Sequence, residues 1–307
     1  MLKYRADIRT IIYMIATTAI LIVQWNLPSF NIPLFILSLY LAVATAVIAH
    51  NHNHVAIWTN KVMNTLTDYW LTLFYGFPAF GWIPTHNKNH HKLNNKEGDF
   101  TITYRYSEAN NLKTLITYPP ISSYFQQKPI RDYLKELWST NRLDFWLYAF
   151  QYVALGAFIA IMLVIDWQKA LLYVIIPQQV ALYSIMIFNY VQHVHADEES
   201  EWSHSRNFLG LTNQFLFNNG YHTIHHWRAS IHWSETPEAH KKIEHLIHPS
   251  LNQSGFWSYI FNSYFIGLVR PSKRTRSLRL ERIAKQSAQA MNEQTPLHNA
   301  QKEMQHA

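Results

Sequence analysis

The sequence predicts an all-α integral membrane protein with four transmembrane helices in two hairpins and a cytosolic helical cap that carries clustered histidines. Hydrophobic residues make up 49% of the 307 residues and charged residues only 15%, whereas a typical soluble domain carries about 25% charged residues. The apolar residues gather in four long runs, and most of the 18 histidines fall in tight groups between or directly after these runs.

The first two apolar runs predict one helical hairpin. They comprise residues 11–25, extendable back to Ile8, and residues 32–49, with an uncharged connector that contains Pro28. Each run approaches the roughly 20 residues that cross a hydrocarbon core. A cleaved signal peptide would need a small-residue cleavage site after the first run, and the sequence has none there.

The third and fourth runs predict a second hairpin. They comprise residues 143–167 and 170–191, with Asp166 and Lys169 as the charges at the turn. Pro177 and the two glutamines after it interrupt the fourth run. Such residues in a spanning helix usually face protein or a cavity. The aromatic stretch 70–82 is predicted to be an interfacial or re-entrant segment, and the stretch 254–269 an interfacial helix. Four spans are therefore predicted, with five or six left open.

Basic residues predict the orientation of the spans. Lys3, Arg5 and Arg9 precede the first run, the segment between the second and third runs is rich in lysine and arginine, and a basic cluster follows residue 269. By the positive-inside rule these segments lie in the cytoplasm. Both termini and every histidine group then lie on the cytoplasmic face. We attribute the formal charge of +7 to an anionic membrane surface rather than to nucleic acid.

Two regions are expected along the chain. Residues 1–270 form the membrane domain with its histidine-bearing cap. Residues 271–307 form a basic and then polar tail, which we expect to be disordered or to lie on the membrane surface.

Four histidine groups have the spacing of metal ligands. Residues three or four apart on a helix share a face. The residues that this rule brings together are His50 with His54, His86 with His90, Asn189 with His193, and His222 with His225 and His226. Adjacent histidines such as His90 and His91 splay by about 100°, so one helix could serve two metal ions. Nine converging imidazoles suit two metal ions with open positions for oxygen.

The ligand type alone leaves the metal open. Imidazole suits iron, copper, nickel and zinc, and the absence of cysteine excludes thiolate sites and cysteine-bound iron–sulfur clusters. Zinc has no redox chemistry, whereas iron can activate oxygen beside an acyl chain. The remaining isolated histidines are expected to be ordinary surface residues: His204, His232, His240, His245, His248, His298 and His306.

The pattern H-x3-H, H-x3-HH, N-x3-H and H-x2-HH, interleaved with two helical hairpins, resembles the membrane fatty acid desaturase superfamily. That superfamily also includes related hydroxylases, alkane monooxygenases and carotenoid oxygenases. The resemblance covers residues 49–226 and does not extend to the tail. A single histidine box would be weak evidence, but the full set in this order is specific.

The resemblance implies nine metal ligands: His50, His54, His86, His90, His91, His193, His222, His225 and His226. Asn189 matches the asparagine that approaches one iron through water in acyl desaturases. His52 departs from the family pattern and leaves open whether His50 or His52 pairs with His54. His52, His195 and Asp197 are expected beside the ligands. No catalytic residue beyond the ligands and no organic cofactor site is expected.

The resemblance further implies two iron ions, dioxygen as co-substrate, and a lipid acyl chain that receives a double bond. Electrons must come from a separate ferredoxin, rubredoxin or cytochrome b5 with its reductase. The chain has no glycine-rich nucleotide fingerprint and no cysteine for a cluster.

Several roles can be predicted for the charged residues near the histidine groups. Acidic residues after the boxes, among them Glu97, Asp99, Asp197 and Glu201, could accept hydrogen bonds from ligating histidines. For Glu198 and Glu199 a solvated acidic loop is favoured. Arg206, Arg228 and Trp233 could hold a carrier headgroup, but a membrane-surface position explains the two arginines equally well.

Three alternatives are open at this point. A di-iron hydroxylase or monooxygenase of acyl chains, alkanes or carotenoids shares every motif. A membrane divalent-metal transporter would place histidines and carboxylates at mid-membrane depth. Here the histidine groups follow span ends, and the acidic residues within the spans, Asp144 and Asp166, lie at span edges. A basic membrane adaptor would leave the histidine spacing unexplained.

Overall fold

The computed structural model describes residues 1–305, with side chains described as far as residue 292. Helix accounts for 72% of the structure. The strands in this part of the chain are two parallel two-residue pieces, β1 (Asn207–Phe208) and β2 (Asn252–Gln253). The prediction of a mainly helical chain is confirmed.

Four helical segments are long and apolar enough to cross a membrane: Arg5–Asn26, Ile32–His54, Arg142–Ile165 and Trp167–His193. They contain, in order, η1 (Arg5–Asp7) with α1 (Ile8–Asn26), α2 (Ile32–His54), α6 (Arg142–Ile165), and α7 (Trp167–Ala170) with η4 (Leu171–Ile175) and α8 (Ile176–His193). The predicted number of four candidate spans is confirmed. The second and fourth continue beyond their apolar runs and end in histidines.

Polar caps set the ends of these helices. The Asn31 side chain accepts a hydrogen bond from the Leu34 backbone N–H and so begins α2. The Asp166 carboxylate accepts from the backbone N–H groups of Gln168 and Lys169 and begins α7. The third helix therefore ends at Ile165, two residues before the predicted end, because an aspartate cap separates it from the next helix.

The interruption predicted near Pro177 takes the form of a short π-helical segment, η4, immediately before α8. Gln178 donates from Nε2 to the Leu73 carbonyl at 2.7 Å, and Gln179 lines a cavity. Gly76 ends α3 (Lys61–Tyr75) with φ 85°, and a Cβ there would lie 2.5 Å from Cβ of Gln178. Glycine is required at this contact both for its backbone angle and for its size.

The histidines after the first two spans lie on short elements that follow α3. These are η2 (Ala79–Gly81), the π-helix η3 (Ile83–His90) and α4 (His91–Leu93). The long helix α5 (Leu112–Thr140) then leads to α6. Asn111 and Thr114 cap its start reciprocally.

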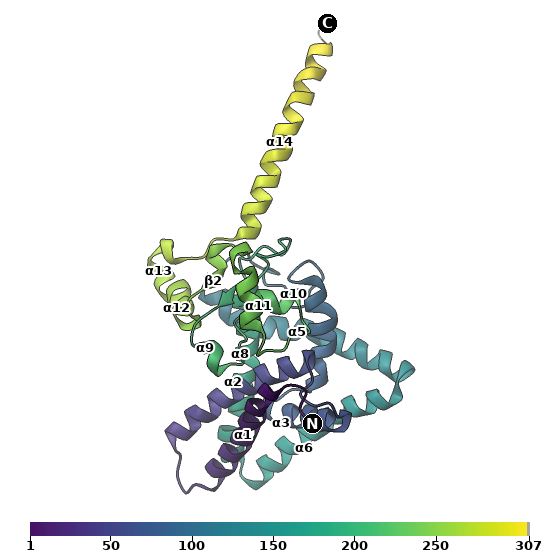
Figure 1. Cartoon of the computed structure of the whole chain (residues 1–307), viewed down its shortest axis with the longest axis vertical. Helices are drawn as coiled ribbons and strands as arrows, with labels where there is room; N and C mark the ends of the chain where they lie inside the picture. Colours follow the sequence, from purple (N-terminus) through teal and green to yellow (C-terminus); the bar gives the residue numbers. More distant parts are fainter. Residues whose placement is uncertain (306–307) are drawn as a thin grey trace.

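The chain after α8 forms a set of short helices and one long final helix, α14. Their bounds are α9 (Thr212–Phe215), α10 (His222–Trp227), α11 (Thr236–Ile243), η5 (Glu244–Leu246), η6 (Pro249–Leu251), α12 (Phe256–Ile260), η7 (Phe261–Ile266), α13 (Gly267–Val269), η8 (Pro271–Lys273) and α14 (Leu278–Gln305). In Figure 1, α1, α2 and α6 occupy the lower part of the view, α10 to α13 lie above them, and α14 extends away from both. The helical state of 256–269 agrees with the predicted interfacial helix at 254–269. Its membrane position stays a prediction, as do the character of the tail and the boundary at residue 270.

The core forms where α2 packs against α1, α3 and α8. Ala44, Val47 and Leu71 are fully buried there, together with Ala181 and Val191 of α8. Small side chains allow the helix backbones to approach closely. This packing fixes the two helix ends from which His50 and His193 project.

The isolated histidines do not all lie on the surface. His204, His232 and His240 are buried, so the surface prediction is wrong for these three, whereas His245 and His248 are exposed as predicted. His232 is held by the buried carboxylate of Asp7 at 3.1 Å. The side chain of His298 and all of His306 lie outside the described part.

Candidate metal centre

The nine predicted ligands converge from four elements into two neighbouring groups. The C-terminal turns of α2, the η3–α4 segment, the end of α8 and the short helix α10 supply them. The first group consists of His50, His54, His86, His91 and His225, and the second of His90, His193, His222 and His226. Within each group the ligand nitrogens lie within 4.8 Å of one another.

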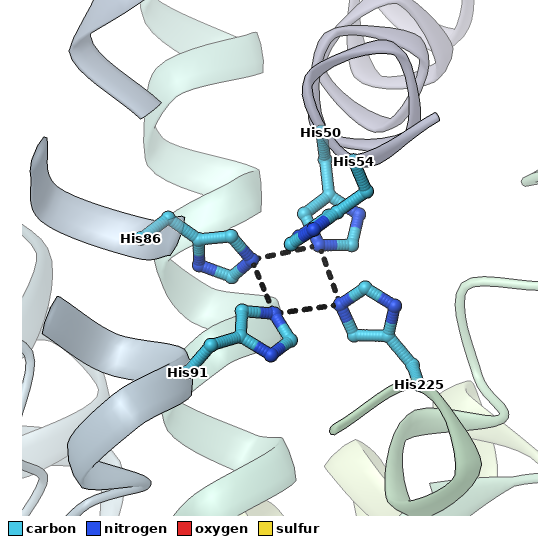
Figure 2. Close-up of side chains that lie close together, drawn as sticks. All are labelled: His50, His54, His86, His91 and His225. Carbon is cyan, nitrogen blue, oxygen red and sulfur yellow. Dashed lines mark hydrogen bonds between the residues drawn. The ribbon is translucent and has the colours of Figure 1, made fainter. Parts of the chain in front are cut away.

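Four imidazoles of the first group form a closed ring through their Nε2 atoms, drawn with dashed lines in Figure 2. The four sides are His50–His86 at 2.9 Å, His86–His91 at 3.1 Å, His91–His225 at 3.0 Å and His225–His50 at 3.0 Å. A point at the centre of such a ring would lie about 2.1 Å from each nitrogen, which matches a metal–imidazole bond of about 2.0–2.1 Å.

These four contacts cannot all be hydrogen bonds. One Nε2 atom of a neutral imidazole either donates one proton or accepts through one lone pair. Each nitrogen in the ring nevertheless has two partners, so at most half of the four contacts could be hydrogen bonds. The geometry is that of lone pairs directed at a shared centre, which fits a metal ion.

His54 completes the first group. Its Nε2 atom is buried and has no hydrogen-bond partner among the described residues, and its ring lies 4.5 Å from that of His91 and 4.7 Å from that of His225. A buried polar atom without a partner is costly. A fifth metal bond would satisfy it.

His193 is the central member of the second group. Its Nε2 atom lies 2.9 Å from that of His222, 3.1 Å from that of His90 and 3.2 Å from that of His226. A single ring nitrogen cannot serve three hydrogen bonds. The second group therefore also fits a metal ion, with four imidazoles rather than five.

The grouping differs from the predicted helix faces at two places. His86 lies with His91, not with His90. The π-helix η3 has i→i+5 hydrogen bonds, and the one from the His91 backbone N–H to the His86 carbonyl brings these two residues together. On α10, His225 turns to the first group while His222 and His226 turn to the second. Adjacent His90 and His91 serve different groups, as the predicted splay requires.

Burial keeps the histidines outside the spans neutral. Desolvation first, and then repulsion from neighbouring imidazoles, holds the pKa of His86, His222, His225 and His226 well below the ordinary value. Neutral imidazole is the form that binds a metal. The site is thus prepared for metal at neutral pH.

A buried carboxylate orients one ligand. His90 donates from Nδ1 to Asp99 Oδ2 at 2.7 Å, and Asp99 is 1% exposed. Burial raises the pKa of Asp99, but attraction to His90 and hydrogen bonds from His90 and Thr101 outweigh it, so the pKa lies below its ordinary value. Asp99 is one of the acidic residues expected to contact a ligand, and it fixes the nitrogen by which His90 faces the centre.

The other expected neighbours lie outside the two groups. His52 accepts from the Ile57 backbone N–H and lies 3.4 Å from Asp68, so His50 rather than His52 joins His54 in the group. His195 lies 2.7 Å from both Thr275 Oγ1 and the Glu108 carbonyl.

Asn189 and the acidic loop have other partners. Asn189 donates to the Tyr118 hydroxyl at 2.6 Å and lines the cavity beside both groups. Asp197 pairs with Arg282 at 2.7 Å. Glu198 is buried and pairs with Arg282 at 2.9 Å, so the solvated-loop prediction is wrong for Glu198, whereas Glu199 is exposed.

Arg206 is a positioning residue that sequence reasoning misassigned. It is 1% exposed, so neither a headgroup site nor a membrane-surface position applies to it. Its Nη1 donates to the Val191 carbonyl at 2.5 Å and to the Val194 carbonyl at 3.0 Å, and its backbone N–H donates to the Gln192 carbonyl. A guanidinium thereby caps the end of α8 around His193.

Arg228 and Trp233, the other two residues predicted to hold a carrier headgroup, lie away from Arg206. Arg228 is exposed. Trp233 donates from its indole N–H to buried Asp7 at 3.0 Å. The trio therefore does not form one binding site.

A cavity of about 430 Å³ adjoins both histidine groups. His50 and His86 of the first group and His222 of the second line its inner part, with Trp82 and Phe188. Further away it runs between α5 and α8, where exposed Gln127 and Gln179 lie at its edge. Its size lies in the range of small-molecule sites.

Fold and site together define a class: an integral membrane protein with two adjacent histidine groups able to hold metal ions beside a cavity. The family model described as fatty acid desaturase matches residues 26–254. The chain belongs to the fatty acid desaturase family, whose members are membrane oxidoreductases that bind iron. Comparison with curated proteins and with solved structures gave no match.

Proposed function

We propose that this protein is an oxygen-dependent di-iron desaturase that introduces a double bond into a lipid acyl chain. The observation that carries the proposal is the pair of histidine groups, one with five imidazoles and one with four, next to a cavity that both groups line. Iron bound there would supply the oxygen activation needed to remove hydrogen from an unactivated C–H bond.

The donor set favours a redox metal with open positions. Zinc in proteins is almost always four-coordinate and has no redox chemistry, whereas the first group offers five imidazoles. The described residues place no carboxylate in either group. Asp99 acts through His90 and keeps that ring in one orientation.

The cavity supports an acyl substrate. Tyr75, Phe77 and Ile185 give it apolar walls, and Asn189 and Gln192 place amides near the metal groups. Apolar walls with a few placed polar groups are typical of ligand sites. The walls would hold an extended chain, exclude water from the reacting carbon, and determine which C–H bond faces the centre.

The membrane arrangement is part of the proposal. We infer two helical hairpins with their short turns outside, and both termini and all histidine groups in the cytoplasm. The basic residues flanking the spans support this orientation. A separate cytosolic ferredoxin, rubredoxin or cytochrome b5 with its reductase would deliver electrons to this face.

Lipid profiling tests the reaction. The wild type, expressed in a host that lacks this enzyme, should yield lipids two hydrogens lighter than their precursors. His225→Ala removes one corner of the first ring and should abolish the product, whereas His248→Ala, at an exposed histidine outside both groups, should not.

Two outcomes would contradict the proposal. Products heavier by one oxygen atom would assign a hydroxylase or monooxygenase instead. Equal activity of His225→Ala and wild type would remove the metal site from the reaction. Iron analysis provides a check independent of turnover, with two ions per chain expected for the wild type.

A further inference from the structure

The segment 256–269, formed by α12, η7 and α13, has two opposite faces. One face is buried and includes Tyr259 and Tyr264. The other presents large apolar side chains that are 49–79% exposed: Trp257, Phe261, Phe265, Leu268 and Val269. Their spacing of about four residues forms one stripe along the helix, which we call the apolar stripe.

Hydrogen bonds fix the orientation of this segment. The Tyr264 hydroxyl donates to Asn110 Oδ1 at 2.5 Å, and Asn110 Nδ2 donates to the Tyr259 hydroxyl at 3.1 Å. The Arg206 guanidinium lies 4.7 Å from the centre of the Tyr259 ring. The apolar stripe therefore cannot turn inward without breaking buried polar contacts.

The segment lies at the level of a span end. Phe256 packs on Phe188 of α8 with ring centres 5.1 Å apart. Phe188 is five residues before His193, which at 1.5 Å per residue is about 8 Å along the helix. The last turns of a span are where the hydrocarbon core gives way to the headgroup region. Figure 1 places α12 and α13 at the outer edge of the upper part of the molecule.

Charge follows the stripe directly. Arg270, Lys273 and Arg276 are exposed, and the sequence from 254 to 280 contains no acidic residue. Arg274 is also exposed, but it donates to the Gly267 carbonyl at 2.7 Å and caps α13. An apolar face with a basic border is the pattern of helices that lie on anionic lipid.

We propose that the apolar stripe inserts into the cytoplasmic leaflet and that the adjacent basic residues bind anionic lipid headgroups. The contact is a peripheral one, separate from the four spans and from the metal centre. A protein partner would have to cover five large side chains at the level of the headgroups, where lipid already surrounds the spans.

Single-cysteine labelling tests this contact, because the natural sequence contains no cysteine. A nitroxide is attached at Phe261→Cys or Phe265→Cys, with Glu238→Cys, at an exposed position of α11, as the matched control. The full chain is reconstituted in phosphatidylcholine vesicles with or without phosphatidylglycerol. Accessibility to oxygen, which enters lipid, is compared with accessibility to a water-soluble nickel chelate.

Labels at 261 and 265 should be reached by oxygen and shielded from nickel, and the label at 238 should show the reverse. Anionic lipid should increase the difference. Replacing Arg270, Lys273 and Arg276 by Gln should remove that increase, since each basic residue near an anionic leaflet strengthens binding roughly five-fold.

Two results would overturn the proposal. Nickel access at 261 and 265 in both lipids would place the stripe in water. Dipolar coupling between labels at 261 would show that a second copy of the chain covers it. Neither readout depends on activity, so the outcome is independent of the proposed desaturase function.

Discussion

Replacing Asp99 by asparagine is the sharpest test of how the second histidine group is held. Asp99 Oδ2 accepts from His90 Nδ1 at 2.7 Å and from the Asn95 backbone N–H at 2.9 Å. Its Oδ1 accepts from the backbone N–H and the hydroxyl of Thr101, each at 2.7 Å. Every neighbour of the Asp99 carboxylate donates a hydrogen bond. In Asp99→Asn, the side-chain NH2 group would therefore face a donor whichever of the two oxygen positions it took.

The size of the effect follows from these contacts. An asparagine loses two hydrogen bonds to a charged acceptor, each worth about 1.5–3 kcal/mol. We therefore expect the free energy of unfolding to fall by about 3–6 kcal/mol. Loss of a carboxylate behind a metal-binding histidine typically lowers metal affinity by about 10–100-fold, and only the group that contains His90 should be affected.

The assay is iron content during competition with a chelator, together with denaturant unfolding in detergent. Asp99→Asn should retain the ion of the five-histidine group and lose the other at lower chelator concentration. Asp132→Asn is the control, because its pair with Lys128 is exposed and such pairs contribute little. Two ions with unchanged chelator resistance in Asp99→Asn would refute the orienting role of Asp99.

Three further outcomes are expected. Arg206→Met leaves buried carbonyls at the end of α8 unpaired and should lower the free energy of unfolding by about 2–4 kcal/mol, whereas exposed Arg228→Met should change it by less than about 0.5 kcal/mol; equal effects in denaturant unfolding would contradict the cap. In the metal-free protein, burial and then neighbouring imidazoles lower the pKa of His225 and His226, so below about pH 6.5 the unfolded chain binds more protons than the folded one. Stability should be complete above about pH 7 and fall as the pH drops through 6.5, and a flat profile from pH 5 to 8 would rule this out. Met186→Trp narrows the cavity between α5 and α8 and should shift products toward shorter chains in lipid profiles without loss of iron; an unchanged chain-length profile would place the substrate elsewhere.

Local sequence was sufficient to predict the apolar helices of this protein and the positions of its clustered histidines. Each span depends on the hydrophobicity of about 20 consecutive residues, and four apolar runs indicated the four candidate membrane-spanning helices found in the described part of the chain. The histidine spacing, together with the family resemblance, likewise pointed to the nine members of the two groups and left open the choice between His50 and His52, because ligands on one helix must lie within a turn or so of each other.

The division of these histidines between two centres was decided by tertiary structure. The π-helical form of η3 pairs His86 with His91, and no local rule for an α-helix predicts it. His50 was chosen over His52 by the packing of α2 on α8, which directs one face of the last turn of α2 inward.

The burial of several polar side chains likewise could not be predicted from the sequence. Arg206 resembles any surface arginine in the sequence, yet it is enclosed because the carbonyls at the end of α8 can accept from its guanidinium. His232 is buried through contacts that are distant in the sequence, because Tyr4 stacks on its ring and Asp7 lies 3.1 Å from its Nε2 atom. The sequence by itself determined which residues could bind metal and which segments could cross a membrane. Only the tertiary structure decided which imidazoles share a centre, since that depends on contacts between four separate helix ends.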